Sequence, residues 1–429
     1  MKRRWLGIAG CLLTAAAMIA AVLLFPTPAA SPTGTEASRP SSSRKEPLSS
    51  SQETGETESP VSDELRGMWV TFFELGGFFD SEEGFEKSFQ TLLDRCEQNG
   101  VNALFVHVRS HCDAFYPSAL FPWSKYASGM KGTQGTDPGF DPLAFMIEAA
   151  HARGIAFHAW INPYRVLSDS TDLGDLCDQS PAKSWLTDDD PSNDTWVCRA
   201  EGGLYLNPAV EQVQALVVNG VREIVNTYDV DGIHFDDYFY PTTDESFDEK
   251  EYAAYRSAVW DDPLPLADWR RANINAMVSR VYGTVKACRA SCRFGISPMA
   301  GIRNNYETVY ADVAAWAGGG YLDYLMPQLY FGFEYPQEES RFDRLLADWK
   351  ALTDSSGTAL YIGLGAYRIG ATDANNIEWS EHHDLLARQV RCLREAACRG
   401  FCLYSYSTYF ADDASHQEER AAFLREIGL

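Results

Sequence analysis

The feature that most constrains this sequence is a short β-rich run followed by an amphipathic helical pattern, repeated eight times within residues 65–429. The runs are apolar nearly throughout, which is typical of parallel strands buried on both faces. Eight such units predict a (β/α)8 barrel. A doubly wound sheet is disfavoured, because no G-x-G-x-x-G opens a helix after the first run.

The predicted strands are 67–72, 103–108, 155–161, 232–235, 293–297, 324–329, 360–365 and 400–405. The clearest helical patterns cover 85–98, 142–153, 208–227, 269–288, 341–352 and 383–399. The longest insertions follow strand 3 (167–206) and strand 4 (242–266). In a barrel of this type, these enlarged loops would lie on the face that carries the chemistry.

The N-terminus has the pattern of an export segment. Lys2, Arg3 and Arg4 precede an uncharged and mostly apolar run that ends at Phe25, as in a secretion signal or an N-terminal membrane anchor. We expect residues 1–30 to be this segment, kept as an anchor, cleaved, or lipidated at Cys11. Residues 31–64, rich in Ser, Thr, Pro and Glu, are expected to be a disordered linker. The barrel domain would then occupy 65–429, outside the cytoplasm.

Charge and cysteine content limit which macromolecules, membranes and metal ions we expect the chain to bind. Lys and Arg number 36 and Asp and Glu 60, which gives a net charge of −24. Nucleic acid is disfavoured because phosphate contacts need a basic surface, and we expect membrane contact only through the N-terminal segment. The ten cysteines include no C-x-x-C, so a zinc ribbon is not expected. Cys177 and Cys198 are the pair most readily bridged, although packed free thiols are the stronger expectation.

Polar residues gather at the carboxyl ends of the predicted strands, where a barrel places its reactive groups. Strand 4 continues as His234-Phe235-Asp236-Asp237-Tyr238, and strand alternation places His234, Asp236 and Tyr238 on one side and Asp237 on the other. Burying so many polar groups without partners would cost a few kcal/mol each, roughly, which favours a functional reading. The candidate substrate-binding residues are Arg109, His111, His158, Trp160, Asn162, Tyr164, Arg165, His234, Tyr238, Ser297, Gln328, Tyr330, Tyr404 and Tyr406.

Several collinear motifs carry a resemblance to a known family. They include "RGMWVTFFE", "VHVRSHCDAFYPSALFPWSKYASG", "FHAWINPYRV", "VDGIHFDDYFYP", "FGISPMAGIRNN" and "GFCLYSYSTYF". Over about residues 65–411 the chain resembles the glycosyl hydrolase-like 10 family, whose members are exported barrel proteins. The resemblance implies hydrolysis of glycans, and some members act on bacterial peptidoglycan. Asp236, Arg109 and Asp113 match the family pattern, whereas Asp237 and Phe239 stand where Tyr and Arg are common.

Glycoside hydrolysis needs two carboxyl groups, one ionised and one protonated. Asp236 is the expected nucleophile or base. Asp113 and Asp237 are the candidate proton donors, and Asp113 is slightly preferred because adjacent strand residues point to opposite sides. Glu74 and Glu334 are reserves. The partner is a polysaccharide or oligosaccharide, and no cofactor or metal is expected.

Two other functions remain open at this stage. One is a non-catalytic glycan-binding barrel at the cell surface, which would need the aromatic and polar cleft residues but not two facing carboxylates. The other is a metal-dependent deacetylase that uses His111, His158 and His234 with Asp236. Neither H-E-x-x-H nor H-x-x-E-H spacing supports the second function.

Overall fold

Parallel strands close into a barrel in the computed structural model, which describes residues 64–429 except residue 260. The barrel strands are β1 (Leu65–Val70), β2 (Ala103–Arg109), β3 (Ala156–Ile161), β7 (Gly232–Phe235), β8 (Arg293–Ile296), β9 (Tyr324–Leu325), β10 (Ala359–Leu360), β11 (Ile362–Leu364) and β12 (Gly400–Leu403). The expected export segment and all but the last residue of the expected linker lie outside the described residues.

The hydrogen-bonded order of the strands is β10-β9-β8-β7-β3-β2-β1-β12-β11. Only Tyr361 separates β10 from β11, and β10 pairs with β9 while β11 pairs with β12. These two segments are therefore the halves of one strand that joins both ends of the sheet. The ring has eight strand positions, which confirms the predicted (β/α)8 class.

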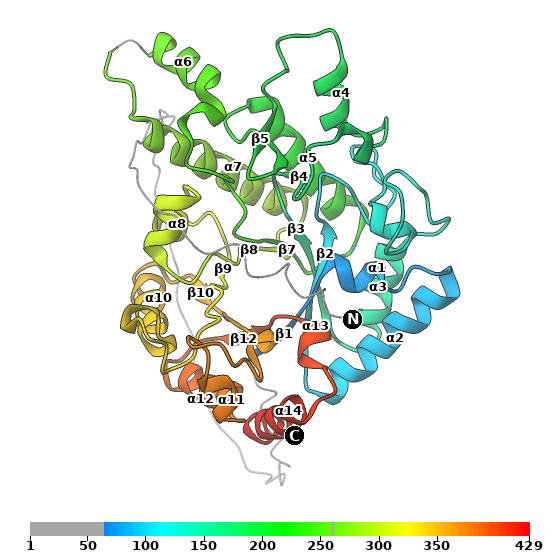
Figure 1. The fold of residues 1–429 in the computed structure, drawn as a ribbon, viewed down its shortest axis with the longest axis vertical. Helices are drawn as coiled ribbons and strands as arrows, with labels where there is room; N and C mark the ends of the chain where they lie inside the picture. Colours follow the sequence, from blue (N-terminus) through cyan, green and yellow to red (C-terminus); the bar gives the residue numbers. More distant parts are fainter. Residues whose placement is uncertain (1–63, 260) are drawn as a thin grey trace, which may run out of the picture. The chain divides into compact units, whose positions relative to one another are not determined.

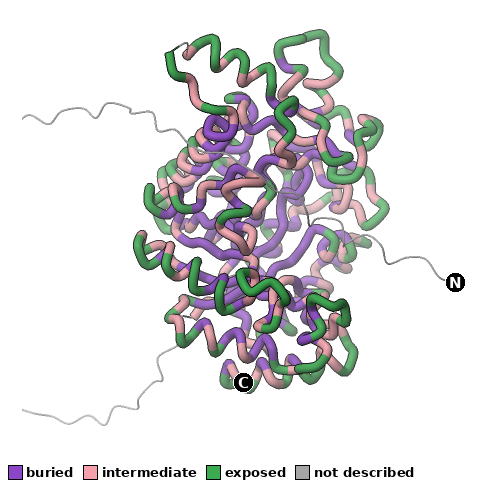
Figure 2. Tube along the Cα trace, turned by 60° about the vertical axis from the view of Figure 1, so that its left-hand side comes forward, coloured by how far each residue is buried: buried purple, intermediate pink, exposed green. Residues whose placement is uncertain are grey.

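Helices surround the strands (Figure 1). The long ones are α2 (Glu82–Gln98), α3 (Pro142–His151), α5 (Glu211–Thr227), α7 (Leu266–Cys288), α10 (Phe342–Ser356), α12 (Leu385–Glu395) and α14 (Ala414–Ile427). Helix α3 shows how the sequence sets such a start: the Asp141 carboxylate accepts from the N–H groups of Leu143 and Ala144, and Pro142 occupies the first turn. Figure 2 shows the strands as buried tubes and much of the outer helical layer and its loops as exposed.

Short helices and strands follow the carboxyl ends of several barrel strands. After β3, the segments β4 (Arg165–Leu167), β5 (Val197–Ala200) and β6 (Gly203–Leu206) form a small antiparallel sheet in the order β4-β6-β5, accompanied by α4 (Pro181–Thr187). Helix α6 (Glu249–Ala258) follows β7. The remaining short helices are α1 (Phe72–Gly76), α8 (Ile302–Thr308), α9 (Val313–Gly319), α11 (Glu378–Glu381) and α13 (Tyr406–Tyr409).

The cysteines of the described residues are free thiols. The expected bridge between Cys177 and Cys198 is therefore not formed. The Cys198 thiol instead contacts the carbonyl oxygens of Thr195 and Phe247, at 3.4 and 3.2 Å. Within 64–429, no helix is long and apolar enough to cross a membrane.

Candidate active site

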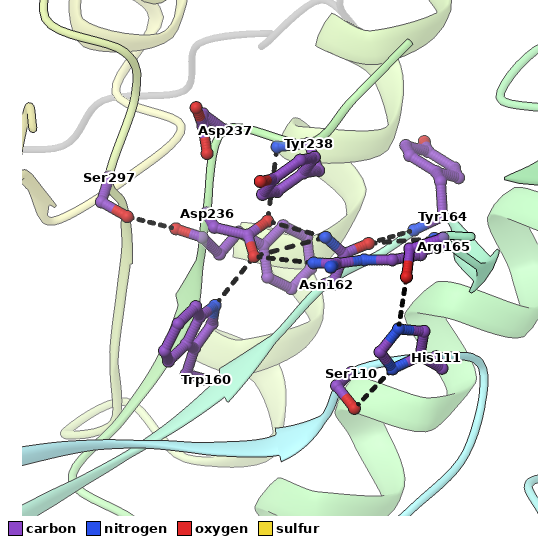
Figure 3. A network of polar contacts seen from close by, with 12 residues as sticks. Ser110, His111, Trp160, Asn162, Tyr164, Arg165, Asp236, Asp237, Tyr238 and Ser297 are labelled. Carbon is purple, nitrogen blue, oxygen red and sulfur yellow. Dashed lines mark hydrogen bonds and ion pairs between the residues drawn. The ribbon is translucent and has the colours of Figure 1, made fainter. Parts of the chain in front are cut away.

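Asp236 stands at the centre of a polar network just beyond the end of β7 (Figure 3). The net effect of its surroundings is a raised pKa, with burial the largest cause. Its carboxylate accepts from the Trp160 indole N–H at 3.0 Å and from the Asn162 amide at 3.3 Å. The Tyr238 backbone N–H also donates, at 3.3 Å, and the Arg165 guanidinium lies 4.0 Å away. Burial raises the pKa of Asp236, whereas the Arg165 charge and these donors lower it. The donors all favour an ionised carboxylate.

Asp237 has different surroundings. It is half-buried, and its Oδ1 accepts a side-chain hydrogen bond from Gln328 Nε2 at 3.1 Å. The same Gln328 amide is held by the Ser297 carbonyl at 3.0 Å. Burial, followed by the negative charge of Asp236, raises the pKa of Asp237 to about 7. Burial raises the pKa of both neighbouring carboxyl groups, but only Asp236 has a guanidinium and several N–H donors around it that favour its ionised form.

Two predicted histidines lie beneath this network, inside the barrel. The Tyr324 hydroxyl contacts Nδ1 of both His158 and His234, at 3.1 Å each. His234 Nε2 contacts the Ser297 hydroxyl at 3.1 Å and accepts from the Trp69 indole at 3.3 Å. Burial lowers the pKa of His234 well below its usual range and that of His158 to about 3. Both rings are therefore neutral members of a supporting layer.

Trp160 holds Asp236 through its N–H while one face of its indole is covered. The His107 ring stacks on that face with centroids 3.8 Å apart and planes at 11°. Trp160 is 7% exposed, so little of its surface is open to solvent. The expectation that it stacks on a sugar stays a prediction, and the contact that the structure shows is with the carboxylate.

Asn162 lies in the short connection that follows β3, and Arg165 is the first residue of β4. The Asn162 side-chain oxygen accepts from the backbone N–H groups of Tyr164 and Arg165, at 3.3 and 2.9 Å. This fixes the amide so that its NH2 points at Asp236. The Arg165 guanidinium lies against the Tyr238 ring, with Cζ 4.5 Å from the ring centroid. Tyr238 is exposed, and it is the outermost group of the network.

Asp113 and His111 belong to the turn after β2. The Asp113 carboxylate is buried and accepts from the backbone N–H groups of Ser110 and His111, at 3.3 and 2.9 Å. Cys112, which lies between His111 and Asp113, has φ 51°, a left-handed conformation that these hydrogen bonds stabilise. His111 is held by the hydroxyls of Ser110 at 2.9 Å and Ser168 at 3.4 Å. Asp113 is therefore a structural cap of this turn.

Three predicted residues lie away from the two carboxyl groups. A register shift in β2 between His107 and Arg109 turns the Arg109 side chain outward, where its guanidinium packs on the Phe121 ring at 4.4 Å. Tyr164 is fully buried in the hydrophobic core, and Figure 3 shows its ring pointing away from Asp236. Tyr406 is buried on α13 against Phe410, with ring centroids 5.0 Å apart.

Tyr330 and Tyr404 form a half-buried aromatic cluster with Tyr367, which the sequence reading had not selected. The Tyr330 ring stacks on Tyr404 and meets Tyr367 edge-on, with centroids 5.6 Å apart in both pairs. Burial raises the pKa of Tyr330 and Tyr404, and the Asp237 charge contributes to both shifts. The cluster thus neighbours Asp237.

Other groups missed by the sequence reading include His107 and Trp69. Strand alternation would have found them, because His107 follows Phe105 on the inward side of β2 and Trp69 lies inward on β1. Of the reserve acids, Glu74 accepts from the Ser405 hydroxyl at 2.8 Å and the Thr71 N–H at 2.6 Å, and so ties α1 to the end of β12. Glu334 is exposed.

No cluster of three or more His, Cys, Asp or Glu side chains suited to a metal ion occurs in the part of the chain that the structure describes. His158 and His234 instead share the Tyr324 hydroxyl. The arrangement around Asp236 and Asp237 is a carboxyl pair with neutral and cationic donors, which is suited to acid–base or nucleophilic chemistry.

Comparison with known proteins finds relatives that are named as glycosyl hydrolases. Among curated relatives, "Glycosyl hydrolase YngK" of Bacillus subtilis (strain 168) is 35% identical over 358 residues, which cover 77% of this chain and 66% of that protein. "Glycosyl hydrolase DigH" of Escherichia coli (strain K12) is 33% identical over 308 residues, 67% of each chain. The chain thus spans about two thirds of the length of these relatives.

A solved structure with a similar fold is alpha-L-fucosidase isoenzyme 2 from Paenibacillus thiaminolyticus, with a TM-score of 0.53 and 16% identity over 85% of this chain and 49% of that one. This likeness concerns the barrel fold alone. The sequence profile described as "Glycosyl hydrolase-like 10" matches residues 64–381, from the start of β1 to the end of α11. The chain therefore belongs to the glycosyl hydrolase-like 10 family.

Proposed function

We propose that this chain is a glycoside hydrolase that cleaves O-glycosidic bonds of a polysaccharide, with Asp236 as nucleophile or base and Asp237 as proton donor. The observation that carries the proposal is the pair of carboxyl groups at the end of β7, of which Asp236 has several N–H donors and a guanidinium nearby and Asp237 has one side-chain donor and a raised pKa. Glycosidases need such a pair, one ionised and one protonated. The family and the barrel fold support the same reaction class.

In the proposed reaction, Asp237 gives its proton to the glycosidic oxygen as the bond to the anomeric carbon breaks. Asp236 stabilises that carbon, either by bonding to it or by activating a water molecule against it. The N–H groups of Trp160 and Asn162 and the Arg165 charge keep Asp236 anionic before the reaction. Water supplies the hydroxyl group that ends on the anomeric carbon. Its remaining proton replaces the one that Asp237 gave to the leaving sugar.

Asp237 replaces Asp113 as the preferred donor for a geometric reason. Strand alternation would place Asp236 and Asp237 on opposite sides, but β7 ends at Phe235, so alternation does not apply to them. The Asp113 carboxylate already accepts hydrogen bonds from two backbone N–H groups of its own turn. Burial raises the pKa of both groups, but Asp113 is buried whereas Asp237 is only half-buried and so has the access to substrate that a donor needs.

We extend the proposal to the substrate and its location. The glycan strand of peptidoglycan is the proposed polysaccharide, and the barrel is proposed to act outside the cytoplasm. The first point rests on the resemblance stated above, since some members of the family to which the chain belongs act on peptidoglycan. The second rests on the cationic and apolar pattern of residues 1–30 followed by a Ser- and Pro-rich stretch.

The test measures release of new reducing ends from purified peptidoglycan glycan strands and from a panel of other polysaccharides. We expect Asp236→Asn to lower kcat by about 10³-fold or more, with a much smaller change in binding. Asp237→Asn should be slow on natural linkages but much less so on aryl glycosides with an activated leaving group. These need little protonation.

Two further variants act as controls. Asp189→Asn removes an exposed loop carboxylate and should leave turnover unchanged. Asp113→Asn should change kcat far less than Asp237→Asn. If the wild-type protein binds glycan but releases no reducing ends from any polysaccharide, the non-catalytic glycan-binding barrel is the correct reading.

A further inference from the structure

The Tyr238 ring stands out among the aromatic side chains of the barrel. Most of them are packed in the core, whereas Tyr238 is 48% exposed. Its position is also special, because it directly follows Asp236 and Asp237, and its backbone N–H donates to Asp236 at 3.3 Å. Almost half of this ring's surface is therefore open to solvent beside the two carboxyl groups.

The orientation of this ring is fixed from one side. The Arg165 guanidinium lies against it, with Cζ 4.5 Å from the ring centroid, and the same guanidinium is 4.0 Å from Asp236. Figure 3 shows the Tyr238 ring lying over Arg165 and beside the Asp236 carboxylate. Asn162 anchors the backbone of Arg165 in turn, at 2.9 Å. The ring is thus pre-organised, with one face on the cation.

The depth of the two carboxyl groups decides which part of a glycan meets Tyr238. Asp236 is buried, so the sugar whose anomeric carbon reacts must reach down into the barrel. Asp237 is half-buried and nearer the mouth, where it protonates the oxygen of the leaving sugar. Tyr238, the outermost of the three, therefore lies on the leaving-group side.

We propose that the outer face of the Tyr238 ring is the binding platform for the pyranose ring on the leaving-group side of the cleaved bond. This inference rests on the proposed function and adds to it the place and the chemistry of one subsite. The C–H face of a pyranose packs on an aromatic ring by burying apolar area, and the Arg165 charge beneath does not compete for that face. The platform selects for a sugar ring as the leaving group.

The experiment compares two probes that differ only in the leaving group. The first is a tetrasaccharide fragment of peptidoglycan glycan strands, and the second is the disaccharide fluoride of the same sugars, whose leaving group carries no ring. For Tyr238→Ala we expect kcat/KM to fall about 10- to 100-fold on the tetrasaccharide, mostly through KM, and less than threefold on the fluoride. Tyr238→Phe keeps the ring and should restore tetrasaccharide turnover to within about threefold.

Phe73→Ala is the matched control, because Phe73 is 54% exposed on α1 and touches neither carboxyl group. It should leave both probes unchanged. Equal losses on both probes for Tyr238→Ala, failure of Tyr238→Phe to restore turnover, or the same loss for Phe73→Ala would each overturn the platform. Turnover of neither probe by the wild-type protein would instead overturn the proposed function, on which the platform rests.

Discussion

The hydrogen bond between Gln328 and Asp237 allows the role of Asp237 as proton donor to be tested through the pH dependence of activity. A neutral N–H that donates to a carboxylate stabilises the ionised form, so it lowers the pKa of Asp237 against burial and the Asp236 charge. Gln328→Leu keeps roughly the volume of the side chain and removes the donor. Because Asp237 must be protonated to act, activity should persist to higher pH in this variant.

The size of the shift follows from the interaction. A hydrogen bond to a charged group contributes about 1.5–3 kcal/mol, and one pKa unit corresponds to about 1.4 kcal/mol. Since Asp237 is partly open to solvent, we discount the effect to about one unit. With a pKa of about 7, about a tenth of wild-type Asp237 is protonated at pH 8. In the variant about half would be, so its activity at pH 8, relative to its own maximum, should be about fivefold greater.

The assay is the pH dependence of kcat/KM between about pH 5 and 9.5, which reports the free enzyme. Wild type should lose activity with a midpoint near pH 7 and Gln328→Leu with a midpoint near pH 8. Asp189→Asn, measured in parallel, should overlay wild type. An alkaline limb that stays in place or moves to lower pH in Gln328→Leu would refute the assignment of Asp237 as the donor.

Three further predictions concern neighbouring residues. Burial and the Asp236 charge raise the pKa of Asp237 to about 7, above the value of about 4 in the unfolded chain, so native-state stability is lost as pH rises from about 4 through about 7. Asp237→Asn should therefore stabilise the fold at pH 8 by about 1–3 kcal/mol and have little effect at pH 4 in urea denaturation; no gain at pH 8 would contradict this. Trp160→Phe removes an N–H that lowers the pKa of Asp236, so the acid limb of the kcat/KM profile should move to higher pH, and an unmoved limb would count against the Trp160 role. Asp113→Ala leaves two backbone N–H groups without their acceptor and should cost about 1–3 kcal/mol of unfolding free energy, while kcat of the folded protein stays within about threefold; a collapse of kcat would return Asp113 to the chemistry.

The barrel could be predicted because its strands are buried on both faces and bounded by turn residues. The strand at 232–235 was predicted with the bounds that the structure gives it. The strand expected at 324–329 is hydrogen-bonded as a strand only over Tyr324–Leu325, since Pro327 has no N–H to donate and Gln328 makes isolated bridges. Alternation and apolar runs therefore predict the position of a strand better than they predict the residue at which its hydrogen bonding to the neighbouring strands ends.

The site was harder to predict because its geometry depends on where regular alternation fails. Asp236 and Asp237 lie beyond the end of the strand at Phe235, where alternation no longer applies, and Arg109 turns outward because β2 shifts register after His107. Neither event has a clear signal in one sequence. That Trp160 and Asn162 hold the carboxylate also depends on the pairing of β3 with β7, which only the fold supplies.

The most direct test of the central claim is a crystal structure of Asp236→Asn with an uncleaved tetrasaccharide of peptidoglycan glycan strands spanning the cleft. We expect an Asp237 oxygen to lie within about 3 Å of one glycosidic oxygen. The side chain at position 236 should lie about 3–3.5 Å from the adjoining anomeric carbon or be joined to it by one water. A glycosidic oxygen that instead meets Asp113 or Glu74, or a glycan bound away from the end of β7, would contradict the account.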